Sequence, residues 1–165
     1  MGSRGQIHDT AIIAPSAVLG AGVTIGAYAA IGEEVHIEDG ASIGCSVVIE
    51  AGARVGKSVR IDSNVIVREG TLIADSVTVG ANSVLGQRPT KAKSSTLASS
   101  GVLPPLRIGE GCQIGVGAVI YAGSEIGSGS FVADGAQVRE GCLIGKNVIV
   151  GHAATVENDC EIGDG

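Results

Sequence analysis

An aliphatic residue returns at every sixth position along almost the whole chain. The first series has no failure and comprises Ile7, Ile13, Leu19, Ile25, Ile31, Ile37, Ile43, Ile49, Val55, Ile61, Val67, Ile73, Val79 and Leu85. A second series, in a shifted frame, is equally complete and comprises Ile108, Ile114, Ile120, Ile126, Val132, Val138, Ile144, Val150, Val156 and Ile162. A period of six fits neither a helix nor a long strand, so it predicts short strands joined by tight corners.

Small residues and glycines occupy fixed places within each unit of six. A small residue stands four positions after most aliphatic ones, as at Ala11, Ala17, Ala29 and Ala41. If it and the next aliphatic residue point inward, the residue between them points outward. Glycine often follows the aliphatic residue, and glycine or asparagine often stands two positions later, where both tolerate the positive φ of a corner. Because one short strand cannot bury its apolar side alone, stacked turns must share an aliphatic core.

This pattern resembles the hexapeptide-repeat family, whose unit reads aliphatic, small or acidic, two free positions, small, one free position. The resemblance covers Ile7 to the end of the chain, apart from one interruption. It implies an all-β, left-handed parallel β-helix with three strands in each coil. The two dozen aliphatic positions then make about eight triangular coils in one domain over residues 1–165.

One outer face of the predicted prism is apolar. Residues eighteen apart share an environment, and the outward positions of this face are Ile12, Ala30, Val48, Ile66, Val84 and, past the interruption, Val119. The outward positions of the other two faces are mixed, with Val18, His36, Arg54 and Leu72 on one and Thr24, Ser42, Arg60 and Thr78 on the other. A contiguous apolar stripe is typical of an interface, and the family resemblance implies a parallel homotrimer. The alternative is that β-propensity alone selects Ile and Val there.

Composition narrows the class of protein. The 165 residues include 44% hydrophobic but only 2% aromatic residues, so Ile, Val, Leu and Ala must build the core. A net charge of -6 argues against a general nucleic-acid binder. There is neither an apolar run of about twenty residues nor a signal-peptide pattern, which predicts a cytoplasmic protein away from membranes. Residues 1–5 resemble a tag remnant, and the end in mid-repeat suggests a truncated C-terminus.

The interruption predicts an extruded loop over residues 87–107. The frame shift corresponds to seventeen extra residues, and the segment contains Arg88, Lys91, Lys93 and Arg107 but no Asp or Glu. Such a positive segment on an acidic chain attracts phosphate groups, and long loops in compact domains are often functional. A solvated loop whose lysines only maintain solubility is the alternative.

Family resemblance gives this loop a role. In acyltransferases of the family, similar loops reach over a neighbouring subunit and help to enclose acyl-coenzyme A or the acceptor. Bacterial members that resemble this chain acylate the amino group of a nucleotide-linked amino sugar. The hypothesis is therefore acyl transfer from coenzyme A to an amine, with backbone N–H groups of Gly115 or Gly151 as oxyanion donors. A non-catalytic scaffold that docks through the basic loop is the alternative.

Three histidines are available as a general base. His8 in the first coil and His36 on a polar face are interpreted as surface residues. His152 is the candidate, because it stands at a corner beside the apolar face, and Glu157 and Asp159 are nearby in the chain. A route without any side-chain base also stays open. The γ-class carbonic anhydrases share the fold but bind zinc through three histidines, two of them five residues apart; that spacing is missing here, so no metal is expected.

Three of the four cysteines fall at the inward small position. They are Cys112, Cys142 and Cys160, and the last two stand one coil apart on the same face. Their expected Cα separation of about 4.8 Å permits a disulfide. Buried thiols that act as small hydrophobic groups are the alternative in a reducing compartment. No Cys-x-x-Cys spacing for zinc occurs.

Overall fold

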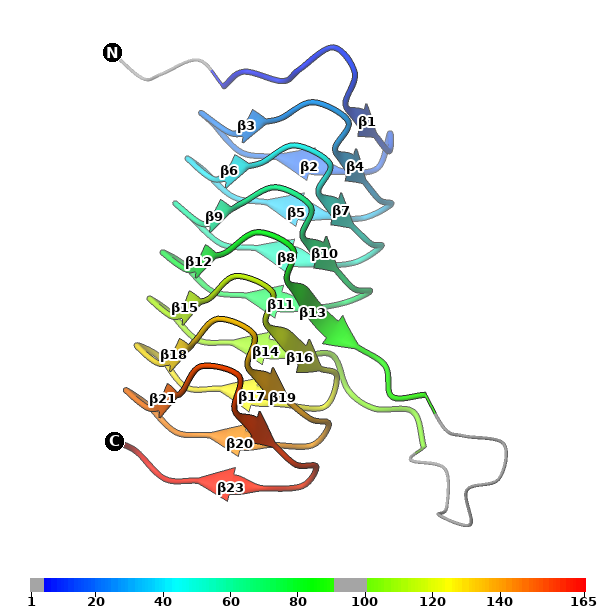
Figure 1. Cartoon of the computed structure of the whole chain (residues 1–165). Helices are drawn as coiled ribbons and strands as arrows, with labels where there is room; N and C mark the ends of the chain where they lie inside the picture. The colour runs from blue at the N-terminus through cyan, green and yellow to red at the C-terminus, as the bar shows by residue number, and fades with distance from the viewer. Residues whose placement is uncertain (1–4, 91–100) are drawn as a thin grey trace.

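The chain winds into a three-sided β-helix built from 23 short strands (Figure 1). The computed structural model describes residues 5–90 and 101–165. In Figure 1 the chain crosses the front from left to right and returns behind from right to left as it descends, so the coil is left-handed. The predicted left-handed parallel β-helix of about eight coils is confirmed. The described part of the chain contains no helix of the length and hydrophobicity that a bilayer span requires.

Every third strand belongs to the same parallel sheet. The first sheet contains β1 (Ile12–Ile13), β4 (Ala30–Ile31), β7 (Val48–Ile49), β10 (Ile66–Val67), β13 (Val84–Gln87), β16 (Val119–Tyr121), β19 (Gln137–Val138) and β22 (Thr155–Val156). The second contains β2 (Val18–Leu19), β5 (His36–Ile37), β8 (Arg54–Val55), β11 (Leu72–Ile73), β14 (Arg107–Ile108), β17 (Glu125–Ile126), β20 (Leu143–Ile144) and β23 (Glu161–Ile162). The third contains β3 (Thr24–Ile25), β6 (Ser42–Ile43), β9 (Arg60–Ile61), β12 (Thr78–Val79), β15 (Gln113–Ile114), β18 (Phe131–Val132) and β21 (Ile149–Val150).

The core is a single column of aliphatic side chains inside the prism. Both predicted inward positions are buried: Ile37 and Ile49 are at most 2% exposed, and the small-position residues Val35 and Val47 are fully covered. Only the end coils are looser, where Ile13 and Ile162 are partly buried. Each covered side chain contributes about 1.5–3 kcal/mol of gross hydrophobic stabilisation, and this burial, rather than aromatic packing, holds the coils together.

The corners use glycine for two different physical reasons. Gly40 and Asn64 adopt φ values of 70° and 60°, as predicted for corner residues. The glycines that directly follow the aliphatic residues, apart from Gly86, do not have positive φ, so the prediction is wrong for them. They are needed because neighbouring coils approach closely: a Cβ added to Gly115 would lie 2.4 Å from the backbone nitrogen of Asp134.

The regular winding is broken once, after β13. Ile73 pairs with Ile108, thirty-five positions later, where a regular coil needs eighteen, so seventeen residues are extra. The ladder between β13 and β16 is irregular between Leu85 and Gln87, and Gly86 adopts a φ of 81°. The chain therefore departs at the corner between the first and second sheets and returns at Arg107 to resume the same register (Figure 1).

Candidate functional site

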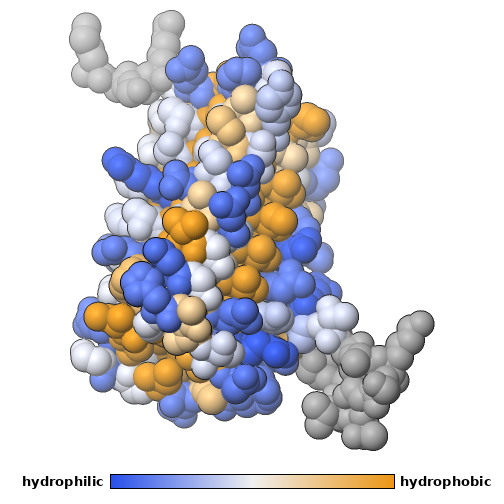
Figure 2. All heavy atoms as spheres, viewed as in Figure 1, coloured by the Kyte–Doolittle hydropathy of each residue, from blue (hydrophilic) through white to orange (hydrophobic). Residues whose placement is uncertain are grey.

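The outer face of the first sheet carries a continuous apolar column. Figure 2 shows hydrophobic side chains descending over this sheet. The residues occupy successive strands in direct register and are the predicted ones, Ile12, Ala30, Val48, Ile66, Val84 and Val119. Ile12 is 73% exposed and Val48 37%, whereas the other four are half-buried. We call this set the apolar column. The loop junction flanks it on one edge of the sheet, whereas the corner of His152 lies on the opposite edge, two coils beyond Val119.

At the loop junction the two described basic residues already have acidic partners. Arg88 follows β13, and its Nη2 lies 3.2 Å from Oε2 of Glu69. Arg107 begins β14 and points outward, with Nε 3.7 Å from Oε1 of Glu125 in the next coil. Both pairs are exposed, so their net contribution to stability is small. The predicted residues Lys91 and Lys93 lie outside the described residues.

Further charged side chains surround this junction. Nη1 of Arg68 lies 2.7 Å from Oε1 of Glu50, and Nη2 of Arg68 donates to Oε1 of Gln87 at 3.3 Å. On the opposite side of the junction, the guanidinium of Arg139 lies 4.9 Å from the ring centroid of Tyr121 and hydrogen-bonds to Glu140. The described root of the loop is therefore nearly charge-balanced, and its carboxylates reduce the positive field that the loop sequence alone suggests.

The pKa values of Arg139 and Glu140 are shifted from their ordinary values. The hydrogen bond from Arg139 lowers the pKa of the Glu140 carboxyl, and the same bond raises the pKa of Arg139. Glu140 therefore stays ionised beside the aromatic ring of Tyr121, where the guanidinium makes a cation–π contact. This cluster lies at the corner directly after β19, two coils beyond the loop junction.

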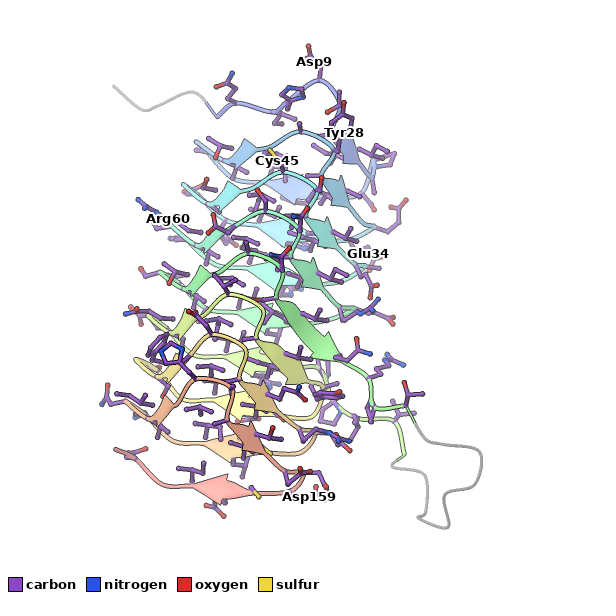
Figure 3. The ribbon with its side chains drawn as sticks, viewed as in Figure 1. Asp9, Tyr28, Glu34, Cys45, Arg60 and Asp159 are labelled. Carbon is purple, nitrogen blue, oxygen red and sulfur yellow. The ribbon has the colours of Figure 1, made fainter. Side chains whose placement is uncertain are left out.

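His152 lies at the corner between the third and first sheets, on the other edge of the apolar column. Its Nδ1 lies 3.9 Å from Oδ2 of Asp134, one coil earlier. The other carboxylate oxygen of Asp134 accepts the N–H of Val116 at 2.8 Å, which holds the carboxylate in place. Glu157 and Asp159, expected as orienting groups, instead follow β22 toward the second sheet, and Figure 3 shows Asp159 at that corner. Asp134 takes the place of both.

The two predicted oxyanion donors stand at equivalent places, directly after strands of the third sheet. The N–H of Gly115 donates to the carbonyl of Val132 at 2.7 Å, as part of the ladder between coils. It is therefore already committed and has no free hydrogen to offer a ligand. Gly151 follows β21, the terminal strand of the third sheet, and stands next to His152 in the chain. The role of Gly151 as an oxyanion donor stays a prediction.

The other two histidines lie away from this corner. Nδ1 of His8 is 3.0 Å from Oγ1 of Thr10 in the exposed first coil. His36 points outward on the second sheet, with Nδ1 3.0 Å from the carbonyl oxygen of Glu34. Within residues 5–90 and 101–165, no three or more His, Cys, Asp or Glu side chains are grouped so that they could hold a metal ion.

All four cysteines are free thiols. Sγ of Cys112 donates to the carbonyl of Gly127 at 3.1 Å, and Sγ of Cys142 donates to that of Glu157 at 3.0 Å. Burial raises the pKa of both thiols. Of the two alternatives for Cys142 and Cys160, the structure has the thiols and not the disulfide, and it gives Cys142 a structural hydrogen bond instead of reactivity.

The partners that the sequence reasoning missed follow from the length of one coil. Asp134 precedes His152 by eighteen residues, Arg107 precedes Glu125 by eighteen, and Glu50 precedes Arg68 by eighteen. A search for opposite charges at this spacing finds all three pairs from the sequence. Arg88 and Glu69 are nineteen apart, because the bulge after Leu85 displaces the chain by one residue.

Two segments of the chain match a protein-family model described as bacterial transferase hexapeptide (six repeats). The matched residues are 16–51 and 105–140, on the two sides of the loop. The chain is thus a hexapeptide-repeat protein, and the family resemblance inferred from the repeat is confirmed. No curated protein matches the chain in sequence.

Solved structures share the fold at low sequence identity. UDP-N-acetylglucosamine acyltransferase of Francisella novicida superposes with a TM-score of 0.63 and 21% identity, over 92% of this chain and 62% of that one. LpxA of Acinetobacter baumannii gives 0.58 and 24%, over 95% and 62%. The Arabidopsis UDP-N-acetylglucosamine acyltransferase gives 0.51 and 16%, over 93% and 66%. The chain therefore spans about two thirds of the length of these proteins or less.

Proposed function

We propose that the chain is an acyltransferase that moves an acetyl or longer acyl group from acyl-coenzyme A to an amino group. The acceptor is a nucleotide-linked amino sugar, and the enzyme is a cytoplasmic homotrimer. The observation that carries this proposal is that the corner of the His152–Asp134 pair and the loop junction lie on opposite edges of the first sheet, with His152 three coils, about 14 Å, beyond the loop. The shared fold with UDP-N-acetylglucosamine acyltransferases supports the same class of reaction.

The proposed site requires two subunits. If the apolar column packs around a threefold axis, the corner of His152 in one subunit faces the loop-bearing corner of the next. Arg88 and Arg107 would then exchange Glu69 and Glu125 for phosphate oxygens of the ligand. Association would also cover Ile12 and Val48, which are the most exposed side chains of the column.

The chemistry follows from the groups at the His152 corner. The acceptor nitrogen attacks the thioester carbon, a C–N bond forms, the C–S bond breaks, and coenzyme A leaves as a thiolate that takes up a proton. Nδ1 of His152 lies 3.9 Å from Oδ2 of Asp134, and closing this gap to a hydrogen bond when the ligand binds would hold the proton on Nδ1 and leave Nε2 to accept the proton of the amine. The N–H of Gly151 is the proposed donor to the developing oxyanion.

A transfer assay tests this function directly. The protein is mixed with acetyl-coenzyme A and a panel of nucleotide amino sugars, the released thiol is measured, and the amide is verified by mass. We expect turnover of at least one acceptor, and His152→Ala should lower kcat/KM by about a hundredfold. His36→Ala is the matched control and should leave the rate unchanged. An unchanged rate in His152→Ala would instead support the route without a side-chain base.

Coenzyme A binding separates the enzyme from the scaffold. Calorimetry should detect saturable binding of coenzyme A to the native protein, because a donor site exists whichever acceptor is used. If no coenzyme A binds and no acceptor in the panel turns over, the proposed function is wrong and the scaffold alternative stands.

Light scattering tests the assembly. We expect three times the chain mass of 16.3 kDa. Ile66→Asp places a charge in the apolar column and should dissociate the trimer, whereas Leu72→Asp, at the matching half-buried position of the second sheet, should not. A monomeric native protein would contradict the proposed assembly.

A further inference from the structure

The outer face of the third sheet differs from the other two faces. Its outward residues in order are Thr24, Ser42, Arg60, Thr78, Gln113, Phe131 and Ile149. The first sheet presents the apolar column, and the second presents leucines and the Arg107–Glu125 pair. Only the third sheet presents a run of uncharged hydrogen-bonding side chains with one cation and one aromatic ring.

A shallow groove of about 770 Å³ runs along this face. Its floor consists of the outward residues from β3 to β18, and its rim at the corner toward the first sheet includes Asp62, Val116 and Asp134. Figure 3 shows Arg60 projecting from this side of the prism, away from the core. The groove is therefore an elongated polar surface parallel to the axis of the β-helix.

Two charged residues of the groove, Arg60 and Asp62, differ from the arginines near the loop junction. The four arginines near the loop junction, Arg68, Arg88, Arg107 and Arg139, all lie in ion pairs. Among the residues that the structure describes, neither Arg60 nor Asp62 takes part in an ion pair or side-chain hydrogen bond. The register neighbours of Arg60 are Ser42 and Thr78, which carry no charge. The fork of Arg60 and the carboxylate of Asp62 are thus free to bind hydroxyl groups.

Phe131 supplies an apolar platform at one end of the groove. It is the only phenylalanine of the chain, and it points outward and is half-buried instead of filling the core. Its register neighbour is Gln113, whose amide offers both donors and an acceptor. A flat ring beside a planar polar group matches a pyranose, which has an apolar C–H face and a rim of hydroxyls.

The strand spacing matches an extended sugar chain. Neighbouring strands lie about 4.8 Å apart, close to the rise of one unit in an extended β-1,4-linked saccharide. From Arg60 through Thr78 and Gln113 to Phe131 there are three such steps, or about 14 Å, which is the length of three sugar units. Phe131 and Gln113 would share the first unit, and Thr78 and Arg60 would each meet one of the next two.

We propose that the outer face of the third sheet is a binding site for an uncharged, extended oligosaccharide of about three units. Phe131 packs on the C–H face of one ring, and Gln113, Thr78 and Arg60 bind hydroxyls of successive rings. Asp62 and Asp134 on the rim outnumber the single cation, so the site selects against acidic sugars. This site does not depend on the proposed acyl transfer.

Saccharide titration of the native protein tests the site. Chemical-shift changes are followed on addition of cellotriose, xylotriose and chitotriose, and on addition of β-1,4-linked triglucuronic acid. We expect saturable binding of at least one neutral trisaccharide and at least threefold weaker binding of the acidic one. Phe131→Leu keeps the apolar bulk but removes the ring, and it should weaken binding about tenfold; Gln113→Ala and Arg60→Ala should each weaken it severalfold.

Matched variants on the second sheet give the control. Arg54→Ala removes an exposed arginine of the same coil as Arg60, and Leu143→Ala removes an exposed apolar residue at the same end as Phe131. Both should bind the saccharide like the native chain. The proposal is overturned if no neutral trisaccharide saturates, if the Arg54 and Leu143 variants weaken binding as much, or if the acidic probe binds more tightly and depends on Arg60 alone, which would indicate an anion site.

Discussion

At the inward small position, polar side chains are hydrogen-bonded in the regular coils, but not at the loop junction. In the regular coils, Ser124 and Ser130 donate to the carbonyls of Arg139 and Gly145, fifteen residues later, at 2.7 and 2.8 Å. The thiols of Cys112 and Cys142 make the same link, and so does Ser83 once the seventeen extra residues are counted. Thr71 is fully buried at an equivalent position, and its Oγ1 has no hydrogen-bond partner among the residues that the structure describes.

The exception has a local cause. The acceptor expected for Thr71 is the carbonyl of residue 86, but Gly86 has left-handed φ and the ladder bulges there. The chain thus leaves the coil at the cost of one buried hydroxyl, about 1–3 kcal/mol. Sequence repetition fixes the regular coils, whereas a single glycine conformation fixes where the loop departs.

Of the changes considered, Gly86→Ala at the loop junction should cause the largest loss in the free energy of unfolding. A Cβ at Gly86 would lie 2.4 Å from Oγ1 of Thr71, in addition to the cost of positive φ, so we expect a loss of about 3 kcal/mol in the free energy of unfolding. Gly52→Ala is the control: Gly52 also has positive φ, 68°, but nothing lies within 4 Å, so the loss should be about 1 kcal/mol. Chemical denaturation measures both.

A double variant isolates the steric part of that loss. Thr71→Ala removes the hydroxyl that the new Cβ would meet, so Thr71→Ala with Gly86→Ala should be more stable than the sum of the two single changes predicts. Strict additivity of the two changes would mean that contact with Thr71 is not the source of the strain.

Removing a buried hydroxyl should lower the free energy of unfolding in a regular coil and raise it at the loop junction. Ser124→Ala deletes a donor to Arg139 and an acceptor for the N–H of Cys142, so we expect a loss of about 1–2 kcal/mol. Thr71→Val replaces an unpaired hydroxyl by a methyl group of the same shape and should raise the free energy of unfolding by about 1 kcal/mol. Thermal unfolding of the two variants beside the native protein gives the comparison, and destabilisation by Thr71→Val would show that the hydroxyl has a partner.

The smallest effect concerns the charged corner beyond the junction. Arg139 lowers the pKa of Glu140 in the folded protein, so the pair stabilises the fold above the unfolded-state pKa of about 4.3, and this contribution is lost as the pH falls through the folded value. Glu140→Gln should therefore reduce the difference in unfolding free energy between pH 7 and pH 3 by less than about 1 kcal/mol. If the free energy of unfolding depends on pH as in the native protein, the Arg139–Glu140 pair does not contribute to stability.

Much of the fold follows from the repeat because each unit of six contains its own inward aliphatic and small residues. The aliphatic and small positions are buried where the period places them, and the outward positions of one face form the apolar column. The acidic partners of Arg107 and His152 also follow from the eighteen-residue coil, although the search for acids near in sequence pointed to Glu157 and Asp159 instead. Local proximity was the wrong measure, because in a solenoid the nearest side chains lie one coil away.

The sequence by itself determines the short strands, their corners and the shared aliphatic core, since a strict period of six places an aliphatic side chain inward at every step. The left hand and the three strands in each coil come from the family resemblance and not from the period. The tertiary structure decides which groups meet where the coils depart from that spacing: the carboxylate of Glu69 that faces Arg88 past the bulge, the ladder that occupies the N–H of Gly115, and the unpaired hydroxyl of Thr71 under Gly86. These depend on which backbone groups the stacked coils leave free. That outcome is set by hydrogen bonds between distant residues, which no short stretch of the sequence encodes.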